Sequence, residues 1–114
     1  MFNFGSPEDQ AQVYIEAALG ISGPTLPECP VNEMSLEEQR NAITYLYIAL
    51  SAALREGADA DVVSILEEQY KEAFQVRAAG DEDFRKAAAQ GQGRPPGPAT
   101  RERVNLYKRL AREA

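Results

Sequence analysis

The chain has 114 residues, of which 44% are hydrophobic, and a formal net charge of −6. This length and composition fit one ordinary globular domain with one modest core. The sequence has no histidine and a single cysteine, Cys29. An intramolecular disulfide is therefore excluded, as are catalytic and zinc sites that depend on histidine.

The charge is distributed unevenly along the chain. Residues 1–90 hold 6 basic and 16 acidic side chains, a balance of −10, whereas residues 91–114 hold 6 basic and 2 acidic side chains, a balance of +4. This asymmetry predicts an appended segment with its own partner. Because an acidic body repels nucleic acid and anionic lipid, only the C-terminal segment could contact either. The first ten residues have no basic stretch before an apolar run, so we expect no signal peptide and a cytosolic protein.

A first helix is predicted from Pro7 to Gly20. Ser6 is a suitable N-cap, and proline is well tolerated at the first helical position. One apolar face recurs at helical spacing through Ala11, Tyr14, Ile15, Ala18 and Leu19. We expect Gly20 to end the helix. Phe2 and Phe4, which precede it, either pack back on the body or anchor a neighbouring subunit.

Residues 21–34 predict a long loop. Pro24, Pro27 and Pro30 forbid a helix there and favour an extended, polyproline-like path. A loop of this length in a small domain is typically functional or wraps a surface. Cys29 lies in this loop without a histidine or a second cysteine, so we interpret it as a packed residue rather than a nucleophile.

The most apolar segment is a predicted helix over about residues 36–55. Ser35 and Glu38 have the spacing of a capping box, and Gly57 suits the left-handed conformation just past a helix end. Only two polar side chains occur in the 13 residues 42–54. A run of this length is too short to span a bilayer, and a helix that is apolar all round must be covered on most sides. We expect it to form the centre of the fold, with part of its surface left for an adjacent subunit.

Two further helices are predicted before the C-terminal segment. Asp59 or Asp61 can cap a helix that runs to Gly80, whose apolar stripe contains Val62, Val63, Leu66, Tyr70, Ala73 and Phe74. Its short connection makes it an antiparallel neighbour of the central helix. A short satellite helix over about residues 82–90 has Phe84 as its main apolar anchor. No strand-like alternation and no repeat occurs, so the predicted fold class is all-α, a small helical bundle.

The predicted organisation has three parts. Residues 1–90 form an acidic helical body. Residues 91–99 form a linker, because three glycines and three prolines fall within ten residues. Residues 100–114 form a basic docking helix capped by Thr100. We call residues 91–114 the arm.

The helix of the arm is amphipathic and suited to binding a protein. Its apolar face can fill a groove on a neighbouring subunit while its arginines orient the contact at the rim. The alternative is that the basic helix folds back on its own acidic body, and charge does not separate the two. The candidate partner-binding residues are Arg101, Arg103, Val104, Tyr107, Lys108, Leu110 and Arg112.

The sequence contains no assembled set of catalytic residues, so we expect no enzymatic activity, no cofactor, no metal and no small-molecule substrate. The neighbouring carboxylates lie at helix starts or on polar faces, where they stay solvated. These pairs are Glu37 with Glu38, Asp59 with Asp61, and Glu67 with Glu68. The glycines of the linker follow no strand, which argues against a phosphate-binding loop.

Nucleic acid and membrane are weaker candidates for the partner of the arm. The five basic residues of its helix can bind phosphate, but a major-groove helix does not require a regular apolar face. That face also lacks the tryptophan or phenylalanine typical of helices that lie on a membrane. We therefore predict a protein partner, with nucleic acid as a secondary candidate and no membrane.

In the order of its parts, the chain resembles the head–tail adaptor (connector) proteins of tailed bacteriophages. The matching parts are the helical body, the wrapping loop over residues 21–34, and the arm that ends in a helix. The resemblance implies a non-enzymatic subunit of a homo-oligomeric ring that docks on a portal protein through its arm. It also implies a place in the virion after assembly in the host cytoplasm. An acidic lumen would let DNA slide without sticking. The alternative is a cytoplasmic helical regulator that binds nucleic acid through its basic helix.

Overall fold

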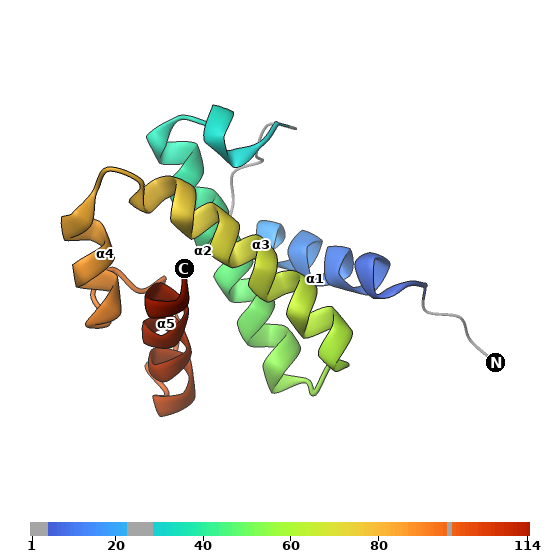
Figure 1. Ribbon diagram of the computed structural model, residues 1–114. Coiled ribbons are helices and arrows are strands. Elements are labelled where there is room, and N and C mark those ends of the chain that lie inside the picture. The colour runs from blue at the N-terminus through green and yellow to red at the C-terminus, as the bar shows by residue number, and fades with distance from the viewer. Residues whose placement is uncertain (1–4, 23–28, 96) are drawn as a thin grey trace.

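In the computed structural model, which describes residues 5–22, 29–95 and 97–114, every regular element is helical. The elements are α1 (Pro7–Ser22), the single 3-10 turn η1 (Val31–Glu33), α2 (Leu36–Arg55), α3 (Ala60–Ala78), α4 (Glu82–Ala89) and α5 (Arg101–Glu113). Helices α2 and α3 pack side by side, α1 packs on both, and α4 and α5 pair at the other side of the bundle (Figure 1). The predicted all-α helical bundle is confirmed.

Helix α2 is the central element, as its apolar sequence predicts. The hydroxyl of Ser35 accepts a hydrogen bond from the Glu38 N–H at 3.2 Å, and the Glu38 carboxylate accepts one from the Ser35 N–H at 2.9 Å. This capping box satisfies two free donors of the first turn. At the other end Gly57 has a φ of +71°, the left-handed conformation that glycine adopts without a steric penalty. Both predicted ends are therefore confirmed.

The buried surface of α2 combines small and large side chains. Ala42, Ala49 and Ala53 are fully buried, and Tyr47 packs on Tyr70 of α3 with ring centroids 5.9 Å apart. The predicted stripe of α3 is buried too, with only Val63 partly exposed. Full burial of a side chain such as Leu66 contributes about 1.5–3 kcal/mol.

Helix α1 begins as predicted. The Asp9 N–H donates to the Ser6 hydroxyl at 3.2 Å, and the Ser6 N–H donates to the Asp9 carboxylate at 3.3 Å. The predicted end at Gly20 is wrong, because the helix continues to Ser22. Glycine ends a helix by adopting a positive φ, and Gly20 does not adopt one. Within a helix glycine costs only about 1 kcal/mol relative to alanine, so packing of the buried face overrides it.

Two stretches with predicted roles lie outside the described residues. One is residues 23–28 of the proline-rich segment, with Pro24 and Pro27, and the other is residues 1–4, with Phe2 and Phe4. The segment returns at Cys29, which is partly exposed. The side-chain amide of Gln39 donates to the carbonyls of Val31 and Met34, at 3.4 and 3.1 Å, and fixes η1 against α2.

The arm turns back on the body. Helix α4 is capped by Asp81, whose carboxylate accepts a hydrogen bond from the Phe84 N–H at 3.0 Å. Beyond it Gly91, with a φ of +89°, reverses the chain so that α5 lies along α4 and against α3 (Figure 1). Of the two placements that the sequence left open, the structure has the one within the same chain.

Candidate protein-docking surface at the junction of body and arm

The apolar face of α5 is covered by its own chain. Leu106, Tyr107, Leu110 and Ala111 are all buried, and Leu110 has no exposed surface. The sequence of α5 is amphipathic, as is typical of a surface helix, and its apolar stripe faces α3 and α4. The arm is therefore a packed part of the fold.

Three tyrosines meet where the arm joins the body. Tyr47 of α2 lies between Tyr70 of α3 and Tyr107 of α5, with ring centroids 5.9 and 5.7 Å away. The Tyr47 hydroxyl donates to the carbonyl of Arg103, and the Tyr107 hydroxyl donates to the carbonyl of Gln92 at 3.0 Å. The Tyr47 hydroxyl thus ties the start of α5 to the body, whereas the Tyr107 hydroxyl joins α5 to the beginning of the arm.

Burial keeps these phenols neutral. It raises the pKa of Tyr107 to about 12 and also raises the pKa of Tyr47 and of Tyr70. The Tyr70 hydroxyl is buried and has no hydrogen-bond partner among the described residues. A buried polar group without a partner costs free energy, so this hydroxyl is a weak point of the core.

Ion pairs hold the outer edge of α5 on α3. Arg109 contacts Glu67 at 2.9 Å and Glu113 at 3.1 Å, and Lys71 contacts Glu113 at 2.8 Å. Hydrogen bonds from Lys71 and Arg109 lower the pKa of the Glu113 carboxyl. Because these groups are partly solvated, they orient the helix more than they stabilise it.

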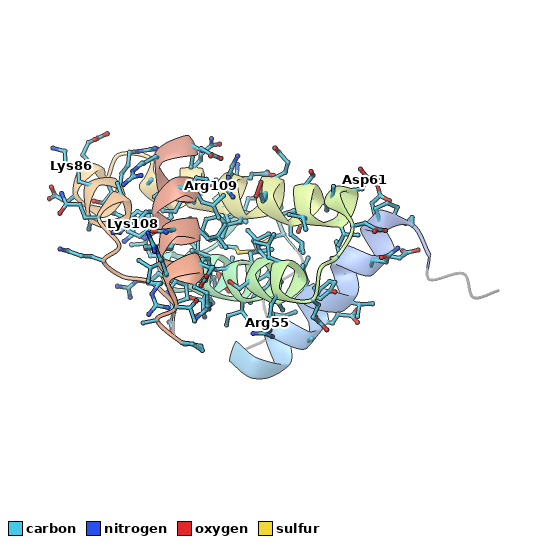
Figure 2. The ribbon with its side chains drawn as sticks, turned by 90° about the horizontal axis from the view of Figure 1, so that it is seen from below. Arg55, Asp61, Lys86, Lys108 and Arg109 are labelled. Atoms are coloured by element: carbon cyan, nitrogen blue, oxygen red, sulfur yellow. The ribbon has the colours of Figure 1, made fainter. Side chains whose placement is uncertain are left out.

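Other cations of the arm face outward. Arg101 and Arg112 are exposed, Lys108 is partly exposed, and no described carboxylate pairs with any of them. Figure 2 places Arg109 where α5 meets α3, and Lys108 on the side of α4. Only one cation of α5, Arg109, is therefore neutralised by carboxylates of the described chain.

A groove of about 440 Å³ lies between the last turns of α2 and the start of α5. Most of its surface is apolar. Its lining residues are Ser51, Leu54, Arg55, Pro98, Thr100, Glu102, Arg103 and Leu106. Leu54, in the last turn of α2, is 44% exposed. We call this hollow the α2–arm groove.

The groove has a defined shape because Arg103 is held. Its guanidinium donates to the Pro98 carbonyl at 3.2 Å and lies 5.1 Å from the centre of the Tyr47 ring. Gly97 leaves room for this, since a Cβ there would lie 2.0 Å from the Arg103 side chain. The wall that the arm contributes is thus fixed relative to α2.

The seven residues predicted to bind a partner are separated by the structure. Arg103 lines the groove, whereas Tyr107 and Leu110 are buried against the same chain and cannot contact a partner while the arm is packed. The remaining four, Arg101, Val104, Lys108 and Arg112, lie on exposed or partly exposed surface. Partner binding by any of the seven stays a prediction.

Sequence reasoning missed Leu54 and Leu106 as lining residues of a groove. The signal for Leu54 was present, because the central helix has more apolar surface than two neighbouring stripes can cover. Leu106 gave no comparable signal, since it lies at the edge of the predicted face of α5. Its place in the groove depends on how the arm packs.

The part of the chain that the structure describes contains neither a cluster of metal ligands nor a membrane-spanning helix. There, no three histidine, cysteine or acidic side chains gather as they would around a metal ion. Among the same residues, no helix has the length and hydropathy needed to cross a membrane.

No family model, curated protein or solved structure matches this chain.

Proposed function

We propose that this chain is a structural adaptor, a non-enzymatic protein that binds other protein chains through the α2–arm groove. The observation that carries this proposal is the apolar lining of a groove with an exposed leucine. Apolar grooves take up the apolar face of a partner helix or loop. A nucleic-acid backbone instead requires converging cations and gains nothing from such walls.

The arm is essential to this function because it forms one wall of the groove. Pro98 and Leu106 contribute apolar surface, while Arg103 and Glu102 add charges to the lining. Charges at the edge of an apolar contact set the orientation of the partner more than the affinity. A partner seated in the groove therefore contacts the body and the arm together.

The specific form that we propose is a connector subunit of a tailed bacteriophage, which docks on a portal protein and becomes part of the virion. Support comes from the resemblance in the order of parts and from the body charge of −10. Terminase, portal and capsid genes beside the gene for this chain are the expected surroundings. A neighbourhood without them would overturn the phage form of the proposal.

The adaptor function is tested by co-expressing the full chain with the portal-type protein encoded beside it. Size exclusion with light scattering should detect a complex that Leu54→Asp abolishes. Leu36→Asp is the matched control, because Leu36 is an exposed leucine on the same helix and does not line the groove. Retention of the complex by Leu54→Asp would overturn the proposed role of the groove.

Fluorescence anisotropy with a short DNA duplex tests the regulator alternative. If the chain is an adaptor, its binding to the DNA duplex should be weak at most. A tight affinity that falls steeply with salt, is lost in the double variant Lys108→Ala with Arg112→Ala, and is unchanged in Leu54→Asp would establish a nucleic-acid function instead.

A further inference from the structure

Three large hydrophobic side chains are exposed in the described part of the chain: Val13, Leu36 and Leu54, with 64%, 64% and 44% of their surface accessible. Scattered apolar side chains on a surface are ordinary. Two of these three, however, lie on surfaces that complement each other. Leu54 lines the α2–arm groove, and Val13 lies at the middle of the outer face of α1.

The outer face of α1 is a narrow stripe with an apolar centre and acidic flanks. Asp9, Val13, Glu16 and Gly20 follow each other at steps of four and three residues, which places them on one side of the helix. All four are exposed, because the opposite side of α1 packs on the bundle. The stripe therefore presents one exposed aliphatic side chain between two carboxylates.

Gly20 gives this stripe a feature that the described residues do not explain. Among those residues, a Cβ added at Gly20 would meet nothing within 4 Å, and Gly20 does not have a positive φ. Alanine would therefore fit at this position and is the better helix former. Glycine is useful on a helix surface where a second backbone approaches closely.

The charges of the two surfaces are also opposite. Helix α1 contains three carboxylates and no basic side chain. The groove contains Arg55 and Arg103 against the single carboxylate of Glu102. Figures 1 and 2 both draw α1 and α5 on different sides of the α2–α3 pair, so the α1 stripe and the wall that the arm contributes to the groove lie apart in each copy.

We propose that the outer stripe of α1 of one copy seats in the α2–arm groove of a second copy. Val13 then packs on Leu54 and Leu106, and the acidic flanks of the stripe lie beside Arg55 and Arg103. This inference rests on the proposed function, since it names the first partner of the same groove. Because two different faces form the contact, the assembly is head-to-tail, and it closes into a ring if the rotation between copies permits.

The experiment is light scattering and sedimentation on the full chain over a range of concentrations. Wild type should form an assembly larger than a dimer. Val13→Asp and Leu54→Asp should each weaken self-association by about tenfold or more, because a carboxylate is then buried in an apolar contact. Leu36→Asp should assemble like wild type. All three positions are exposed, so circular dichroism should confirm intact helices.

Mixing the two defective variants gives the sharpest result. Val13→Asp retains an intact groove and Leu54→Asp retains an intact α1 stripe, so the mixture should form a complex of two chains and no larger species. Only a head-to-tail contact has this property. Reversing charges, Glu16→Arg with Arg55→Glu, should restore assembly that Glu16→Arg alone weakens.

The outcomes separate this inference from the proposed function. A wild-type chain that is monomeric throughout, or a Val13→Asp variant that assembles normally, would overturn the α1 contact. The adaptor function would still stand if Leu54→Asp abolished binding to the portal-type protein. A Leu54→Asp variant that retained both self-association and that complex would overturn both.

Discussion

The α1–α3 bundle and the arm are held in place by different kinds of contact. The bundle is joined by interlocking alanines and aliphatic side chains such as Leu50 and Leu66, which have no exposed surface. The arm also buries apolar residues, but the Tyr47 hydroxyl and the ion pairs with α3 add polar bonds that fix its position. The bundle is thus stabilised by contact that is not directional, whereas the arm is positioned by directional polar bonds.

This difference matters for function because the α2–arm groove lies between the two regions. One wall of the groove is the last turns of α2, which the packing of the bundle holds in place. The other wall depends on the position of the start of α5, which is bonded to the Tyr47 hydroxyl. Changes that loosen the arm should therefore remove the groove before they unfold the bundle, and the following experiments test that comparison.

The largest expected effect is that of Leu66→Ala compared with Leu110→Ala. Both leucines are fully buried, so each truncation should cost about 3 kcal/mol at its site. We expect Leu66→Ala to lower amide-exchange protection in all helices. Leu110→Ala should lower it in α4 and α5 while α1–α3 remain protected. Equal loss of protection throughout both variants would show that bundle and arm unfold as one unit.

A second test uses alkaline pH. The pKa of Tyr107 is about 12 in the fold and 10.0 ordinarily, so above pH 10 the unfolded chain loses a proton that the fold retains. The stabilisation is complete below pH 10 and is lost as pH rises towards 12, by about 2 kcal/mol. Urea unfolding at several alkaline pH values should show this decline.

Tyr107→Phe should make the alkaline decline shallower without abolishing it, because burial also raises the pKa of Tyr47 and of Tyr70. An unchanged decline in the variant would show that Tyr107 ionises as readily in the fold as in the unfolded chain.

Two conservative substitutions in the tyrosine cluster should have effects of opposite sign. Tyr47→Phe removes the bond to the Arg103 carbonyl and should cost about 1 kcal/mol. Tyr70→Phe removes a hydroxyl without a partner in the described chain and should be neutral or stabilising by up to about 1 kcal/mol. Urea midpoints measure both. A marked loss in Tyr70→Phe would mean that this hydroxyl forms a stabilising bond.

The smallest effect is expected from the ion pairs at the outer edge of α5. The pKa of Glu113 lies below its ordinary 4.5, so its contribution is present above that pH and is lost as pH falls through the lowered value. Glu113→Gln should slightly reduce the loss of unfolding free energy at acid pH, which we call the acid limb. Molar salt should have the same effect on wild type. If neither change alters the acid limb, the pairs do not help to hold the arm.

Helix boundaries were predictable where they depend on neighbouring residues. Ser6, Ser35 and Thr100 all cap helices as predicted, because a capping bond joins residues only three positions apart. Gly20 failed as a stop signal since glycine permits a helix end without requiring one. The outcome there depended on packing of α1 against α2 and α3.

The candidate site was only partly predictable. Periodicity correctly identified Tyr107 and Leu110 as one apolar face, but it could not say which surface covers that face. The bonds that decide this join residues 56 and 42 positions apart, Tyr47 with Arg103 and Arg109 with Glu67. The α2–arm groove follows from those bonds, so no local pattern could indicate it.

An all-helical chain with a central apolar helix, an acidic body and a basic amphipathic arm could be predicted from the amino-acid sequence alone. These features follow from composition, periodicity and capping, which act over a few residues. Two further features are visible only in the folded chain: the arm packs on its own body, and Leu54 is left exposed beside it. An amphipathic helix gains the same kind of burial from its own chain or from a neighbour, so specific distant contacts had to make that choice.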